Sequence, residues 1–241
     1  MAAIELIDLT KHYKQGKNVV KALDGVSLSI QSGEFVAVVG RSGSGKTTML
    51  DLLGLLLRPT AGRILIDGVD TGTLKDSARA TMRGERIGFI FQEFNLLPTL
   101  NAIENVMLPL RYRRGRDPEG RARALRLLQE VDLADRVDHK PAELSGGQAQ
   151  RVAIARSLIN NPALVLGDEP TGEVDSETST QLIDLMRRMN RERGVTFVIV
   201  THDMEIAHRT DRIIRLKDGK VLSDDRITAT NGSVQGTPVP A

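Results

Sequence analysis

A glycine-rich stretch from Gly40 to Thr47 is the segment whose residue types most directly predict chemistry. It reads Gly-Arg-Ser-Gly-Ser-Gly-Lys-Thr and matches the phosphate-binding pattern G-x-x-x-x-G-K-[ST]. Glycines let backbone N–H groups turn inward around a phosphate, and the helix expected next adds its N-terminal N–H groups. Lys46 would bind the β- and γ-phosphates, and Thr47 would offer its hydroxyl to Mg²⁺. A random chain of this length matches on the order of one time in a hundred, so we expect a nucleotide site.

Two adjacent acids follow an apolar run at 164–167. A buried strand that ends in Asp168 and Glu169 is costly unless a metal ion or a reacting water uses the carboxylates. We therefore predict that Asp168 holds Mg²⁺ and that Glu169 orients or deprotonates an attacking water. The alternative is a strand that ends in a solvated acidic turn.

Three further polar residues have positions that suit such a site, although each is a weak signal alone. His202 follows the apolar run at 195–200 and could donate to a γ-phosphate, whereas a single histidine is more often structural. Gln92 ends the apolar run at 86–91 and could reach Mg²⁺ or water, or be an ordinary strand-end amide. Tyr13 could stack on adenine, or be a surface tyrosine.

The segment from Leu144 to Arg151 reads Leu-Ser-Gly-Gly-Gln-Ala-Gln-Arg. Ser145 can cap a helix, while Gly146 and Gly147 leave backbone donors uncovered at the helix start, which predicts a second anion-binding helix end. A plain capped helix fits this segment alone. It does not explain why the glycine-rich loop, the acidic pair, Gln92 and His202 occur in the same chain.

Together these features resemble the ABC ATPase family over nearly the whole chain, from about 4 to 225. The resemblance makes 144–151 the signature motif, Glu169 the catalytic base, Gln92 the residue that couples the site to a permease, and His202 the switch histidine. It places Asp175 in the loop that crosses a dimer interface. Four positions depart from the common family pattern without removing a ligand: Ala149, Gly167, Glu173 and Val174. The residues that the resemblance places against ATP are Tyr13, Gly40, Ser42, Gly43, Ser44, Gly45, Lys46, Thr47, Thr48, Ser145, Gly146, Gly147, Gln148 and Asp175, and those against Mg²⁺ are Thr47, Gln92 and Asp168.

The same resemblance implies an assembly. In the family, ATP lies between the P-loop of one subunit and the signature of the other, so we expect a homodimer around two Mg-ATP that drives membrane permease subunits. A groove near 92–110 is the expected permease site. We also expect the chain to act at the cytoplasmic side of the cell membrane, held there through the permease.

The stretch from Gly88 to Leu110 is similar to the lipoprotein-release and macrolide-export branch, whose permeases typically have four membrane helices and a large extracytoplasmic domain. An amino-acid importer shares part of this stretch and is the alternative transport function. A non-transport ABC protein of DNA repair or translation usually carries long or zinc-bearing inserts, which this chain lacks.

These residues need a scaffold that brings strand ends and helix starts together. Short β-branched runs alternate with helical patterns, which predicts an α/β fold with a mostly parallel sheet. With the resemblance, we expect an N-terminal antiparallel β portion, an ATPase domain over 1–226, a helical insert at about 92–160 and a flexible tail at 227–241. Helices are predicted at 46–57, 101–110, 118–131, 148–159 and 176–190.

The composition excludes several other classes. The chain of 241 residues has no cysteine, which rules out disulfides and thiolate metal sites. Its net charge is +2 and only 3% of its residues are aromatic, so no nucleic-acid partner is expected. The apolar stretch 49–57 is far below the ~20 residues that span a bilayer, and 1–14 shows no secretory leader.

Overall fold

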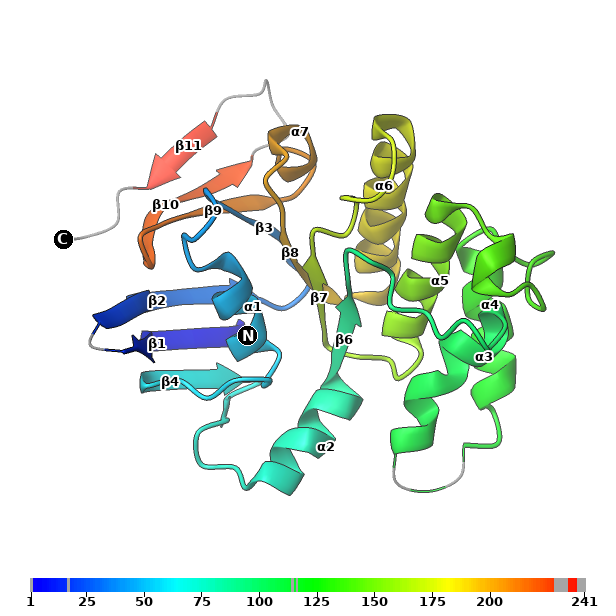
Figure 1. Cartoon of the computed structure of the whole chain (residues 1–241), viewed down its shortest axis with the longest axis horizontal. Helices are drawn as coiled ribbons and strands as arrows, with labels where there is room; N and C mark the ends of the chain where they lie inside the picture. Colours follow the sequence, from blue (N-terminus) through cyan, green and yellow to red (C-terminus); the bar gives the residue numbers. More distant parts are fainter. Residues whose placement is uncertain (1, 17, 114, 116, 228–233, 238–241) are drawn as a thin grey trace.

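A computed structural model describes residues 2–16, 18–113, 115, 117–227 and 234–237. It contains a large and a small β-sheet and a group of helices beside the large sheet (Figure 1). This confirms the predicted α/β fold with its parallel sheet, antiparallel N-terminal part and helical part.

The large sheet carries the strand ends on which the candidate site depends. Its order is β11-β10-β9-β3-β8-β7-β6, and the pairs from β9 to β6 are parallel. All five residues of β3 are buried, because both faces of the sheet are covered. The strands are β3 (Phe35–Val39), β6 (Ile87–Ile90), β7 (Leu164–Asp168), β8 (Thr196–Val200), β9 (Arg212–Lys217), β10 (Lys220–Ile227) and β11 (Val234–Thr237).

The small sheet is antiparallel and has the order β2-β1-β4-β5. In Figure 1 it lies on the opposite side of the molecule from the helical group. Its strands are β1 (Ala2–Gln15), β2 (Asn18–Gln31), β4 (Ala61–Ile66) and β5 (Val69–Asp70).

Helices α3, α4 and α5 pack together beside the large sheet, α5 lies against β6, and α6 packs against α5 (Figure 1). Among the described residues, no helix combines the length and the apolar character needed to cross a membrane. The helices are α1 (Lys46–Leu53), α2 (Asp76–Arg86), α3 (Ala102–Met107), the 3₁₀ helix η1 (Leu108–Tyr112), α4 (Gly120–Glu130), the 3₁₀ helix η2 (Pro141–Glu143), α5 (Gly146–Leu158), α6 (Ser176–Arg193) and α7 (Met204–Ala207).

Two apolar clusters form the core, one on each face of the large sheet. Phe35, Ala37 and Val39 of β3 face the cluster shared with α3 to α6. Val36 and Val38 face the other cluster, in which α1 packs against strands of both sheets. The alternation along β3 thus fixes α1 and the helical group on opposite faces.

Several element boundaries differ from the sequence prediction. Helix α1 ends at Leu53 rather than at 57, because Leu55 adopts a φ of +57° and the N–H groups of Leu56 and Leu57 donate back to the carbonyl oxygen of Asp51. Helix α2 was not predicted, since its face is mostly charged. Of the tail predicted to be flexible, 228–233 and 238–241 lie outside the described residues, while Val234–Thr237 pair antiparallel with β10.

Candidate active site

The loop 40–45 joins the buried strand β3 to α1, and glycine is required at both of its ends. A Cβ at Gly40 would overlap the carbonyl oxygen of Leu216 and lie 3.2 Å from Cβ of Ser44. Gly45 has a φ of +103°, and a Cβ there would overlap the carbonyl oxygen of Ala22. The neighbouring strands therefore lie so close to the two ends of the loop that only glycine fits at these two positions.

Polar groups of this loop suit an anion. The Lys46 ammonium donates to the carbonyl oxygens of Gly40, at 2.8 Å, and Arg41, at 3.1 Å, so it is held over the loop. The hydroxyl of Ser44 is buried and has no hydrogen-bond partner among the described residues. Thr47 and Thr48 lie in the first turn of α1, where free N–H groups and the helix dipole attract negative charge. A bound phosphate would satisfy these donors.

The two predicted acids lie across from the lysine, at the end of β7. Burial raises the pKa of the Asp168 carboxyl, the charges of Glu169 and Asp51 raise this pKa further, and the ammonium of Lys46 opposes them. A carboxylate whose charge is disfavoured in this way gains from a nearby cation, so Asp168 fits the predicted Mg²⁺ site.

Glu169 adopts a φ of +45°, a left-handed conformation that is unfavourable for glutamate, and its N–H donates to Val200 at 3.0 Å. Its Oε1 lies 2.9 Å from Nδ1 of His202, and the backbone N–H of His202 donates to Oε2 at 3.4 Å. The structure therefore brings the ends of β7 and β8 together and pairs two predicted catalytic residues. Strain at such a position is typical of functional sites.

Gln92 follows β6 and is held by the segment after Glu169. Its Nε2 donates to Oε1 of Glu173 at 2.9 Å, and a Cβ at Gly172 would lie 3.2 Å from the Gln92 side chain. Glu173, one of the four departures from the family pattern, is thus the partner of Gln92 in the described part of the chain.

Ser145 is the N-cap of α5, as predicted. The Gln148 N–H donates to its Oγ at 3.2 Å, and the Ser145 N–H donates to Oε1 of Gln148 at 3.0 Å, which closes a capping box. A Cβ at Gly147 would lie 2.6 Å from Cγ2 of Thr178, so the start of α5 packs against α6. Asp175 caps α6 and accepts from both the N–H and the hydroxyl of Thr178, at 2.9 and 2.7 Å.

These hydrogen bonds from Thr178 hold the pKa of Asp175 below its usual value. The capped ends of α5 and α6 thus form one surface, which belongs to the helical part of the molecule. The loop that precedes α1 lies in the other part (Figure 1). Within one chain the structure therefore shows two groups of predicted ATP-binding residues, one at each location.

Tyr13 lies on β1 opposite Val20 of β2. Its side chain is exposed, and the ammonium of Lys11 lies 5.2 Å from its ring centroid. The ring is therefore accessible to a stacking partner.

Sequence reasoning missed buried polar residues that shape the loops of the site. Gln150 on α5 donates to the carbonyl oxygens of Phe91, at 3.2 Å, and Pro170. Asn105 on α3 accepts from the Leu97 N–H at 2.8 Å and donates to three carbonyl oxygens nearby. Each is a polar residue on an otherwise apolar helix face, which is the signal that could have revealed it.

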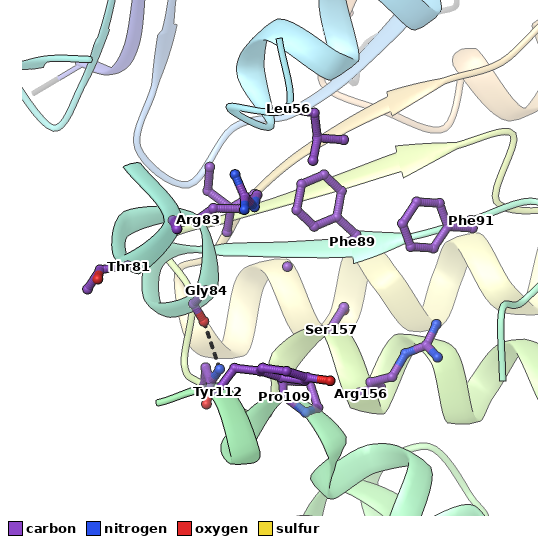
Figure 2. A pocket seen from close by; sticks show the side chains of 14 residues that line it. Leu56, Thr81, Arg83, Gly84, Phe89, Phe91, Pro109, Tyr112, Arg156 and Ser157 are labelled. Carbon is purple, nitrogen blue, oxygen red and sulfur yellow. Dashed lines mark hydrogen bonds between the residues drawn. The ribbon is translucent and has the colours of Figure 1, made fainter. Parts of the chain in front are cut away.

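A groove with a cavity volume of about 570 Å³ lies between α2, β6, η1 and α5 (Figure 2). Its wall includes apolar side chains of Leu56, Phe89, Phe91 and Pro109, and the exposed ring of Tyr112 stands at its edge. The permease groove expected near 92–110 overlaps this one at Pro109, but α2 and β6 form much of the observed wall.

Comparison with known proteins extends these findings. A family model described as ABC transporter matches residues 23–172. An ABC transporter ATP-binding protein of Methanocaldococcus jannaschii, MJ0796, is 48% identical over 228 residues, which are 93% of this chain and 97% of that protein. The macrolide export ATP-binding/permease protein MacB of Syntrophobacter fumaroxidans is 50% identical over 223 residues, and the match covers 92% of this chain but 31% of that protein. The chain thus spans about a third of this MacB relative.

A solved dimer of MJ0796 in a post-hydrolysis state, bound to ADP and Pi, matches with a TM-score of 0.84 and 46% identity, over 94% of this chain and 99% of that chain. The similarity therefore covers sequence, fold and nearly the full length of a single-cassette relative. The chain belongs to the ABC transporter family, as an ATP-binding cassette.

Proposed function

We propose that this chain binds and hydrolyses ATP as a homodimer and drives a membrane permease. The observation that carries the proposal is the convergence of the lysine-bearing loop with the two carboxylates at the end of β7, where Lys46 acts electrostatically on Asp168. Solved dimers of the similar cassette MJ0796 support the homodimer, and the ADP and Pi in one of them support hydrolysis.

Different residues of the site would bind the phosphates, the adenine and the Mg²⁺ ion. The N–H groups of the loop 40–45 and of the first turn of α1 would hold the phosphates, and Lys46 would exchange its two carbonyl partners for phosphate oxygens. The exposed ring of Tyr13 would stack on adenine. Mg²⁺, held by Thr47, Asp168 and Gln92, supplies positive charge that offsets the phosphate oxygens.

Glu169 would accept a proton from the attacking water, so it must give up or share its contact with His202. The imidazole N–H of His202 would then be free to donate to the γ-phosphate. Glu169 at the end of β7 thus acts as a base, and His202 at the end of β8 acts as a hydrogen-bond donor.

The surface formed by the starts of α5 and α6 would close over the nucleotide of the partner subunit. Ser145, Gly146, Gly147 and Gln148 would present backbone and side-chain donors to its γ-phosphate, and Asp175 would lie at the subunit boundary. Because these residues lie in the helical part, away from the loop of the same chain, two subunits arranged head to tail complete two sites.

The apolar groove in Figure 2 would receive a permease segment, and the bound permease would hold the chain at the cytoplasmic side of the cell membrane. The relatives named macrolide export ATP-binding/permease protein MacB support an export system. The resemblance of the stretch 88–110 further implies export or mechanotransmission for lipoproteins, drugs or peptides, with a permease of four membrane helices and a large extracytoplasmic domain.

The test is Glu169→Gln, which keeps the size of the side chain but removes the base. Phosphate release should fall on the order of 10²-fold or more, while Mg-ATP should convert the protein to a dimer on gel filtration. Glu192→Gln, on the exposed side of α6, is the control and should hydrolyse ATP like the wild type. A Glu169→Gln protein that remains monomeric with ATP, or that keeps full activity, would contradict the proposal.

A further inference from the structure

Helix α5 holds both ends of the segment 91–95, which contains Gln92. Gln150, near the start of the helix, donates to the carbonyl oxygen of Phe91. Arg156, six residues later, donates through Nη2 to the carbonyl oxygen of Phe94 at 2.7 Å and through Nη1 to that of Asn95. These contacts join residues about 60 positions apart in sequence.

The Arg156 side chain is buried, although its charge is costly there. Burial lowers the pKa of its guanidinium to about 10, and no carboxylate lies within ion-pair distance of it among the described residues. The fixed fork of the guanidinium instead gives one nitrogen to each of two successive carbonyl groups. A buried cation that donates to backbone carbonyl groups indicates that the position of this backbone is important.

The backbone that Arg156 holds is strained. Phe94 has a φ of +59° and Asn95 a φ of +49°. Asparagine tolerates this left-handed region, whereas a phenylalanine rarely adopts it. The contacts of Arg156 therefore stabilise a conformation that the segment would not favour alone.

The framework around these contacts is rigid. A Cβ at Gly88 would overlap the carbonyl oxygen of Ser157, so β6, the strand that leads to Gln92, lies directly against the backbone of α5. Figure 2 shows the Arg156 side chain at the same end of the groove as Phe91. The same side chain thus borders the groove and holds the loop that carries Gln92.

We propose that Arg156 is a positioning residue for Gln92: it fixes the loop 92–95 to the signature helix, so that the loop and the capped start of α5 move as one body. The proposal rests on the function given above for Gln92 and for the start of α5. A segment seated in the groove would then act on both through one guanidinium.

The first test measures the loop itself, by hydrogen exchange and mass spectrometry on the full chain without nucleotide. Arg156→Lys keeps the charge but replaces the fork by a point donor. We expect peptides that cover 93–97 to exchange about tenfold faster or more, and the rest of the chain to keep its protection. Arg123→Lys is the control. Arg123 is a partly buried arginine of the helical part that pairs with Asp117 and, like Arg156, donates to a backbone carbonyl, that of Ile159, so its substitution should leave 93–97 unchanged.

The second test is kinetic. Arg156→Lys should lower kcat roughly tenfold while KM for ATP stays within about twofold. The reason is that the loop 92–95 acts on the reaction, whereas the loop 40–45 binds the phosphates. In a Gln92→Ala background, Arg156→Lys should lower kcat by less than about twofold. The function that Arg156 supports is then already lost with Gln92.

Unchanged exchange at 93–97, or an Arg156 effect of equal size with and without Gln92, would overturn the proposal. If Arg156→Lys loses protection throughout the chain, Asn95→Ala replaces it as the test. That variant leaves the arginine in place but disfavours the left-handed backbone, so exchange at 93–97 should rise without global loss, and unchanged exchange would again overturn the proposal. A wild-type protein that fails to hydrolyse ATP would count against the proposed function, while the exchange measurement would still test the loop.

Discussion

The same substitution at two glycines, Gly88→Ala and Gly84→Ala, should change stability in opposite directions. At Gly88 on β6 an added Cβ would overlap the carbonyl oxygen of Ser157 and lie 3.0 Å from its carbonyl carbon. Both are backbone atoms of α5, which cannot rotate away as a side chain can. To regain ordinary contact distances, β6 and α5 must separate by several tenths of an ångström to about 1 Å.

The expected cost is that of overpacking a core, about 1–3 kcal/mol. The upper half of that range is appropriate here because a helix backbone has to move. For a chain of this size each kcal/mol lowers Tm by about 2–4 °C, so Gly88→Ala should unfold about 4–12 °C below the wild type.

Gly84 provides the matched control. It lies in α2, is exposed, and a Cβ there has no atom within 4 Å to contact. Its carbonyl oxygen accepts from the Asn160 side chain at 2.8 Å, a bond that alanine retains (Figure 2). Alanine is favoured over glycine inside a helix by about 0.5–1 kcal/mol, so Tm should rise by about 1–4 °C.

Both variants are compared with the wild type by thermal unfolding followed by far-UV circular dichroism, at equal protein concentration. A Gly88→Ala protein at least as stable as the wild type would refute the close contact between β6 and α5. If both variants lost stability equally, the assignment of the two glycines to different surroundings would be wrong.

Two further outcomes follow from the charged groups of the site. Lys46→Ala should raise the Kd for ATP, measured by calorimetry, roughly ten- to a hundredfold, since it removes charge-assisted hydrogen bonds to the phosphates. An unchanged Kd would contradict the phosphate-binding role of Lys46. Asp51→Asn should raise Tm at about pH 8: burial raises the pKa of the Asp51 carboxyl, so the folded state binds more protons than the unfolded chain, and stability falls as pH rises through that pKa. The gain should shrink toward about pH 4, near the ordinary pKa, and a gain that is constant over this range would show that burial of the charge is not its cause.

The parts of the site that the sequence predicted are those set by local chemistry. A glycine-rich loop between a buried strand and a helix, an acidic strand end, and a serine cap each depend on residues within about eight positions of one another, and the structure shows all three. The parallel sheet was predictable for the same reason, since apolar runs and helical patterns alternate along the chain.

The features that sequence reasoning missed depend on contacts between distant segments. Arg156 and Gln150 look like polar residues on a helix until the fold brings the loop 91–95 beside them. The glycine at position 54 is explained only by Phe89, which lies more than 30 positions away and occupies the space beside it. Periodicity describes which face of a helix is buried, but not which backbone it meets.

The proposed ligands share a property that bears on how tightly the site can bind. Lys46 is bonded to two carbonyl oxygens, Glu169 to His202, and Gln92 to Glu173. Each contact with ATP, water or Mg²⁺ therefore exchanges one partner for another, and its net contribution is the difference between the two. The buried hydroxyl of Ser44 differs, because it has no partner in the described part of the chain and could form a bond without giving one up. The backbone N–H groups of the loop and the ring of Tyr13 should add to the affinity that Lys46 contributes. The paired side chains should respond to whether the γ-phosphate is still bonded to the nucleotide. When they exchange one partner for another, the segments that carry Gln92 and His202 lose or regain a contact.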